Sequence, residues 1–285
     1  MSDFTARLAA LHVHPVKSCA GIAVQEAFVE ETGLDLDRAW MVVDRDGEFL
    51  SQRELPAMAR IVPALKGGEV VLRAPGMLAL HLSVDRVEQP LRVRVWDDEL
   101  PAYDMGPLAA QWMSDCLGRP GLRLARFDTE QRRLSSRRWT GDVEALNAFS
   151  DGYPVLVAGQ ASLDDLNTRL AARGAAPVDM RRFRANLVLE GLDPWAEDNV
   201  RELRIATPEG PVVLRLVKPC VRCSIPNVDP DTGATGHEPG DTLAGFRADA
   251  RMNGGITFGM NTVIVEGIGR TLRVGQAVEG DYAFD

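Results

Sequence analysis

Two cysteines give the strongest chemical signal in this sequence. They are Cys220 and Cys223, and they follow an apolar segment, ending at Val217, that predicts a strand. A thiolate is a soft metal ligand and a nucleophile, and a neighbouring guanidinium favours the charged form of the sulfur. Because Arg222 adjoins Cys223, this segment predicts a sulfur that is available for chemistry.

Three ordinary explanations compete for this C-x-x-C pair. A structural zinc site requires four ligands, but Cys19 and Cys116 are isolated, and the histidines include a single weak pair, His12 and His14. A thioredoxin-type redox pair requires the motif at the start of a helix, and Pro226 opposes a helix there. The third explanation, a structural turn that contains two buried thiols, stays open.

Arginines form the second signal in an otherwise acidic chain. Residues 180–186 contain three arginines and an asparagine at the entrance of an apolar strand. Because a guanidinium pairs bidentately with phosphate, this cluster is either an anion clamp or a solvated turn. A richer run, residues 131–138, has no apolar anchor except Leu134 and predicts an exposed connection whose charge steers an anionic ligand.

Single cations and carboxylates occur in further turns. Residues 14–21 predict a strand end followed by a turn that presents Lys17, and Arg38 is expected at the start of the next strand. Each of these two segments alone is typical of a solvated loop. Asp229 and Asp231 belong to an Asp-Pro-Asp-Thr-Gly sequence, which is typical of a turn rather than of a catalytic pair.

The composition is that of a globular protein. The chain has 285 residues, of which 45% are hydrophobic and 26% are charged, and its net charge of −9 disfavours general nucleic-acid binding. No apolar run approaches the roughly 18 residues of a membrane span, and the N-terminus lacks the features of a signal peptide. Four cysteines are too few for a disulfide framework. We therefore expect a cytoplasmic protein without nucleic-acid or membrane partners.

Short strands with alternating polarity dominate the first part of the chain. Hydrophobic and polar residues alternate over 78–84 and 91–95, and the apolar run 39–43 precedes a turn that predicts a hairpin. One helix is expected over 109–117, with Gly and Pro directly after it as stop signals. Cys116 lies on the apolar stripe of this helix and is expected to be a core residue.

A second unit is expected from about residue 121. Residues 153–158 predict a buried strand, residues 162–165 resemble a capping box that begins a helix, and several strands follow. The pattern predicts an α+β, predominantly β protein with two barrel-like domains packed together and a few helices. We place the first domain at residues 1–120 and the second at 121–285.

The motifs around Lys17, Arg38, Arg184 and the C-x-x-C pair, taken together and in this order along the chain, resemble the MOSC family. The similarity is closest to the branch in which an N-terminal MOSC β-barrel domain precedes the MOSC domain, a branch that contains amidoxime-reducing and N-hydroxylaminopurine-detoxifying proteins. The residues that support the resemblance are Pro15 to Ser18, Gly33, Asp37 to Trp40, Arg182 to Asn186, Cys220 to Cys223 and Val228 to Gly233.

The resemblance implies a molybdenum cofactor, in which molybdopterin holds the metal. In the family the second cysteine of the C-x-x-C motif ligates molybdenum, so Cys223 is expected to be the metal ligand and the catalytic residue. A soft thiolate suits such a sulfur-rich centre. The residues expected to bind the pterin and its phosphate are Lys17, Ser18, Arg38, Arg184, Asn186, Val221 and Arg222.

The sequence departs from the family pattern at Asp151 and Gly152, where eukaryotic relatives have hydroxyl side chains. The resemblance therefore leaves these two contacts open or assigns them to backbone groups. It gives Cys220 no metal role, so this thiol is a spectator, a site of persulfide formation or a group behind the ligand.

The implied reaction is a two-electron reduction that removes oxygen from a small N-hydroxylated compound, such as an amidoxime, a hydroxylamine or an N-hydroxylated base. Electrons are expected from a separate electron-transfer protein or reductase, because the four cysteines do not match the spacing of the cluster domain that some bacterial relatives append. The alternative is a sulfur carrier or cofactor-delivery protein with a persulfide on Cys223 or Cys220. A cofactor binder without turnover also stays open.

Overall fold

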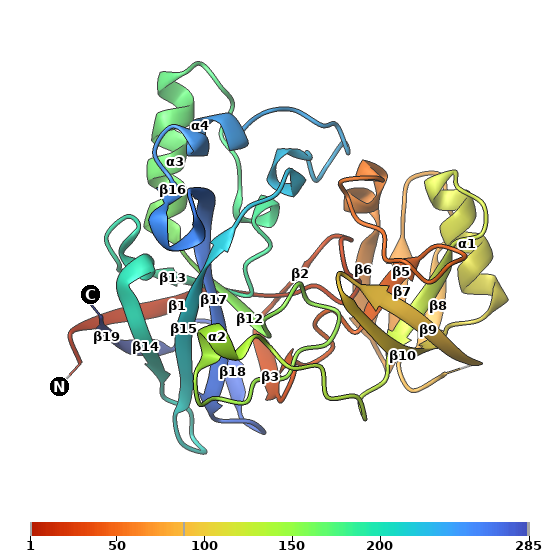
Figure 1. Cartoon of the computed structure of the whole chain (residues 1–285), viewed down its shortest axis with the longest axis horizontal. Coiled ribbons are helices and arrows are strands. Elements are labelled where there is room, and N and C mark those ends of the chain that lie inside the picture. The colour runs from red at the N-terminus through yellow and green to blue at the C-terminus, as the bar shows by residue number, and fades with distance from the viewer. Residues whose placement is uncertain (1, 88, 284–285) are drawn as a thin grey trace.

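Alternation of apolar and polar residues produces strands that bury one face. The computed structural model describes residues 2–87 and 89–283. Its first strand, β1 (Phe4–Val13), buries Leu8, Leu11 and Val13. Figure 1 shows two groups of strands, one around β1 and β17 on the left and one around β5 to β10 on the right, with both chain ends at the far left.

The left group contains a closed barrel of seven strands. Around the ring these are β12 (Val155–Gly159), β13 (Leu187–Glu190), β1, β19 (Ala277–Tyr282), β14 (Val200–Ile205), β15 (Val212–Val221) and β17 (Gly255–Glu266). Pairing of β12 with β17 closes the ring, so its strands leave no free edge. The short strands β2 (Ile22–Val24) and β16 (Ala248–Asp249) pair with β1 and β17.

The right group consists of two smaller sheets over a separate core. One contains β5 (Trp40–Val43), β11 (Arg123–Phe127), β10 (Asp98–Asp104) and β9 (Gln89–Val95), and the other β6 (Val62–Lys66), β7 (Glu69–Arg73) and β8 (Leu80–Ser83). A third sheet joins β18 (Thr271–Arg273), β3 (Glu26–Glu30) and β4 (Gly33–Leu34). The predicted α+β, predominantly β architecture is therefore confirmed.

Helices are few and short in the described part of the chain. The α-helices are α1 (Pro107–Leu117), α2 (Arg137–Thr140), α3 (Gln160–Ala172) and α4 (Gly240–Ala244). The 3₁₀ helices are Pro56–Arg60, Met180–Arg182, Ala196–Asn199, Ile225–Asn227 and Ala250–Met252. Among the helices of residues 2–87 and 89–283, none has the length and apolar character that crossing a membrane requires.

Helix α1 matches its prediction, whereas the start of α3 does not. Gly118 ends α1 in the left-handed conformation, and the half-buried Cys116 packs against the core of its unit. The capping box predicted at 162–165 is wrong, because α3 begins earlier, at Gln160, and has no side-chain cap. Ser162 instead donates to the buried Glu197 carboxylate at 2.7 Å.

The strand pairings mix the two ranges that the sequence suggested. Strand β1 lies in the barrel with β13 and β19, although its residues belong to the range 1–120. Strand β11 pairs with β5 and β10 of the right group, although it belongs to 121–285. The turn after β1 thus contacts the right group, the chain returns for β2 to β4, and it enters the right group at β5 and leaves it after β11.

Candidate functional site

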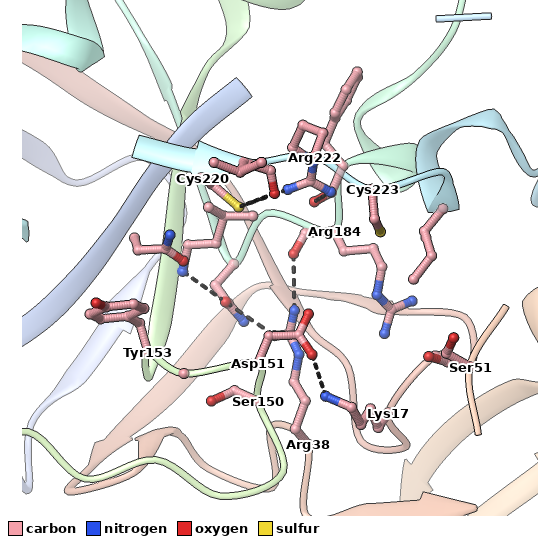
Figure 2. Close-up of a pocket in the computed structure, with 18 of the residues that line it drawn as sticks. Lys17, Arg38, Ser51, Ser150, Asp151, Tyr153, Arg184, Cys220, Arg222 and Cys223 are labelled. Atoms are coloured by element: carbon pink, nitrogen blue, oxygen red, sulfur yellow. Dashed lines mark hydrogen bonds and ion pairs between the residues drawn. The ribbon is translucent and has the colours of Figure 1, made fainter. Parts of the chain in front are cut away.

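A pocket of about 120 Å³ contains all the predicted site residues. Loops from both groups of strands line it, and the residues that the sequence pointed to are Lys17, Ser18, Arg38, Arg184, Asn186, Val221, Arg222 and Cys223. Figure 2 shows the two cysteines of the motif at one end of this pocket, with Lys17 and Arg38 at the other. Cations far apart in sequence therefore surround one cavity.

Lys17 lies in the turn that follows β1. The Lys17 backbone nitrogen donates to the Trp40 oxygen at 2.8 Å, which fixes the turn against β5. Its Nζ donates to the Phe149 oxygen at 2.8 Å and to Asp151 Oδ1 at 2.6 Å. Burial lowers the pKa of Lys17, and the carboxylate of Asp151 opposes this effect. The ammonium therefore stays close to the pocket with a carboxylate as its partner.

Three of the predicted ligands have unusual backbone conformations. Ser18, Arg38 and Arg184 have φ angles of 66°, 51° and 58°. This left-handed region costs a residue other than glycine about 1 kcal/mol or more, and such residues concentrate at functional sites. The conformation turns the chain sharply at each position.

Arg38 is held by an acid and an amide. Its Nη1 donates to Asp37 and, at 3.1 Å, to Asn186 Oδ1, while its Nη2 donates to the Arg184 oxygen at 3.1 Å. Burial would raise the pKa of Asp37, but the guanidinium of Arg38 and the neighbouring His14 hold that pKa below its ordinary value. Asn186 also accepts from the Leu156 nitrogen at 3.1 Å, so it positions Arg38 against the barrel.

Arg184 and Arg222 each have a buried N–H group without a hydrogen-bond partner among the residues that the structure describes. Arg184 Nη1 donates to the Cys19 oxygen, whereas its buried Nη2 has no partner within residues 2–87 and 89–283. The same holds, in the described chain, for Arg222 Nε. Burial, and next the charge of Arg38, lower the pKa of Arg184 to about 10. Buried donors of this kind require an acceptor, and an anionic, hydrogen-bonding ligand supplies one.

The C-x-x-C motif ends β15 and continues into a short 3₁₀ helix. Cys220 is partly buried, and its sulfur lies 3.1 Å from Arg222 Nη1. Arg222 Nη2 donates to the Phe183 oxygen at 3.0 Å, which holds the guanidinium in place. Cys223 is exposed and lines the pocket. Its sulfur is therefore accessible to a ligand in the pocket rather than buried among hydrocarbon side chains.

The arginine cluster at 180–186 divides between two roles. Only Arg184 of its three arginines lines the pocket, where the sequence analysis had placed a clamp or a solvated turn. Arg181 pairs with Asp231 at 2.8 Å and Arg182 with Asp229 at 3.1 Å. Asp229 Oδ1 also accepts from two following backbone nitrogens, which confirms that this segment is a turn.

The prediction that residues 131–138 form only an exposed connection is wrong for Arg133. This side chain is 7% exposed and donates from Nη1 to Asn147 Oδ1 and to the oxygens of Ala148 and Ser150, at 2.8, 2.8 and 2.6 Å. Its role depends on backbone acceptors in a distant loop, which no local pattern reveals. Arg133 thus shapes the loop that ends at Asp151.

Asp151, whose contact the sequence analysis left open or assigned to a backbone group, lines the pocket. Its side chain is 69% exposed, and Oδ1 accepts from Lys17 and, at 3.3 Å, from Trp96 Nε1. Surrounding protein raises the pKa of Asp151, but the ammonium of Lys17 outweighs this effect and lowers the pKa well below the ordinary value. Phe49, Ser51, Arg53 and Tyr153 also line the pocket, and the sequence analysis did not single them out.

This chain has the two domains of one family. The MOSC N-terminal beta barrel domain matches residues 5–120, and the MOSC domain matches residues 145–279. The chain belongs to the MOSC family, as the resemblance in sequence implied.

Curated relatives share most of the chain. Mitochondrial amidoxime-reducing component 1 of Mus musculus is 35% identical over 249 residues, which cover 84% of this chain and 71% of that protein. Mitochondrial amidoxime reducing component 2 of Homo sapiens is 34% identical, with 84% and 72% covered. A molybdenum cofactor sulfurase of Oryza sativa subsp. japonica is 31% identical over 95% of this chain but only 35% of its own length.

Proposed function

We propose that this protein binds the molybdenum cofactor in the pocket between its two groups of strands and reduces small N-hydroxylated compounds there. The observation that supports this proposal is the combination in one cavity of an accessible thiol, Cys223, with buried guanidinium donors at Arg184 and Arg222 that have no partner in the described part of the chain. The names of the amidoxime-reducing relatives agree with it.

The residues present fit such a cofactor. Lys17, Ser18, Arg38 and Arg184 would hold a phosphate and the polar edge of a pterin with cationic and hydroxyl donors. Cys223 would supply a thiolate to the metal, which matches the preference of soft metals for sulfur. When bound, the group would supply two-electron redox chemistry to the pocket. Asn186, Val221 and Arg222 would complete the contacts around the pterin.

The protein's own task is to bind, orient and charge-balance. Arg38 is held rigidly by Asp37 and Asn186, so its position does not depend on the ligand. Arg222 is likewise held by the Phe183 oxygen beside Cys223, at 3.0 Å. Preorganised cations of this kind stabilise negative charge without reorganising at each turnover. Electrons would come from a separate electron-transfer protein or reductase.

The test is metal analysis combined with turnover. Protein made in a host that synthesises the cofactor is expected to contain about one molybdenum per chain and to reduce benzamidoxime with an artificial electron donor. Cys223→Ser is expected to lose more than about 90% of the turnover, while Cys116→Ser, on helix α1, keeps it. Wild-type protein that stays free of molybdenum under these conditions would contradict the proposal.

A sulfur carrier or cofactor-delivery protein is the second candidate. The contact of Arg222 Nη1 with Cys220 Sγ at 3.1 Å favours it, because a guanidinium stabilises an anionic sulfur such as a persulfide. Mass spectrometry separates the two candidates. A mass increase of one sulfur on Cys220 or Cys223, in protein without molybdenum, would support the carrier.

A further inference from the structure

A second recess adjoins the pocket at Cys223. It has a volume of about 660 Å³, and it shares Asp151, Arg222 and Cys223 with the smaller pocket. Arg53 lines both cavities, and Trp96 lines the recess; both residues come from the right group of strands. The recess is therefore the open approach to the thiol, and a substrate that reaches Cys223 from this side passes these side chains.

Trp96 occupies an unfavourable backbone position at this approach. It lies in the two-residue turn between β9 and β10, where Val95 pairs with Asp98. Its φ angle is 56°, in the left-handed region where turns of this kind prefer glycine or asparagine. A bulky residue there is an outlier, and such outliers cluster at functional sites. The turn itself gives no reason for a tryptophan at this position.

Neighbouring side chains hold the indole in place and cover only part of it. The Phe49 ring packs edge-on against it with centroids 4.9 Å apart, and the Arg53 guanidinium lies 4.8 Å from the Trp96 ring centroid. Trp96 Nε1 donates to Asp151 Oδ1 at 3.3 Å. Even so, 46% of Trp96 is exposed. An indole fixed in this way, with part of its surface open to a recess, is a preorganised surface for stacking.

We propose that Trp96 is a specificity-determining residue that stacks on flat aromatic N-hydroxylated substrates as they approach Cys223. The inference rests on the proposed function and deepens it, because it names the part of the substrate that this chain recognises. Aromatic amidoximes and N-hydroxylated bases present a delocalised face to the indole, whereas small aliphatic amidoximes do not. Arg53 and Phe49 are positioning residues, since they act through the indole.

The test compares two substrates that differ in the ring alone. With an artificial electron donor, Trp96→Ala is expected to lower kcat/KM for benzamidoxime about tenfold, mainly through KM, and that for acetamidoxime less than about twofold. Trp96→Phe is expected to restore most of the benzamidoxime activity, and Trp96→Leu is not. Leu78→Ser is the matched control, because Leu78 is an apolar residue that is 89% exposed and lies outside the recess. This variant is expected to leave kcat/KM unchanged for both amidoximes.

A binding measurement gives a readout that does not require turnover. Benzamidine, the product of benzamidoxime reduction, is expected to quench the fluorescence of wild-type protein, and acetamidine is not. This difference in quenching between the two amidines is expected to disappear in Trp96→Phe. Equal losses of kcat/KM for both substrates in Trp96→Ala, or equal quenching by both amidines, would overturn the proposal that Trp96 stacks on aromatic substrates. Failure of wild-type protein to reduce either amidoxime would instead count against the proposed function, so the two failures are distinguishable.

Discussion

Replacement of Arg133 by Met tests whether this buried guanidinium holds the loop that ends at Asp151. The Met side chain keeps the apolar stem but removes the donors to the Ala148 and Ser150 oxygens. A buried acceptor left without a donor costs about 1–3 kcal/mol, so the two together cost about 2–6 kcal/mol. The ion pair with Asp98 adds little, because that carboxylate is 54% exposed.

This loss corresponds to a decrease in Tm of about 4–24 °C, at roughly 2–4 °C per kcal/mol for a domain of this size. Urea and thermal unfolding of the cofactor-free protein measure it. The matched control is Arg132→Met, because Arg132 is 61% exposed and pairs with the half-exposed Glu144. The free energy of unfolding of the control is expected to decrease by less than about 1 kcal/mol. Equal losses in the two variants would refute the assignment of Arg133 as the anchor of the loop.

Three further predictions concern the pocket and its rim. Arg184→Ala is expected to lower molybdenum content about fivefold or more, with little change in the Tm of cofactor-free protein. Burial already lowers the pKa of Arg184 to about 10, so the cation contributes little to the stability of the fold. Metal analysis and thermal unfolding check these two expectations. The difference in unfolding free energy between wild type and Asp151→Asn is expected to shrink below about pH 4. Lys17 lowers the folded-state pKa of Asp151, and this stabilisation is lost as the carboxylate protonates. Urea titrations at neutral and acidic pH measure the difference, and a difference that does not change with pH would contradict the prediction. Trp96→Gly is expected to be about 1 kcal/mol more stable than Trp96→Ala in urea, because both lack the indole but only glycine relaxes a φ of 56°.

The local sequence predicted the strands, and the family resemblance supplied the residues of the pocket, but neither predicted their geometry. Alternation over 91–95 and the apolar stripe of 109–117 are local patterns, and the structure has β9 and α1 there. The left-handed backbone of Ser18, Arg38 and Arg184 occurs where the chain contacts distant segments, for example where the Arg38 nitrogen donates to the His14 oxygen. Such contacts have no signature within a window of sequence.

Buried polar side chains were the main source of error. Ser162 has the type and spacing of a capping residue, but the carboxylate of Glu197, 35 residues away, takes its hydroxyl hydrogen. The Gly159 nitrogen also donates to Glu197, at 3.0 Å, so a distant carboxylate satisfies the start of α3. Arg133 is a similar case, because two of its acceptors are backbone oxygens of a distant loop. Residue type alone therefore does not tell a solvated polar group from a buried one.

The exchange of strands between the two groups explains why the pocket lies where it does. Strand β1 pairs with β13 and β19 along the barrel, and the chain then enters the turn that contains Lys17. A bridge between Val16 and Trp40 fixes the same turn to β5 of the other group. Because neither group can move without breaking one of these attachments, the cations around the pocket are held at fixed positions. A cofactor bound there would spend little of its binding energy on bringing the two groups together.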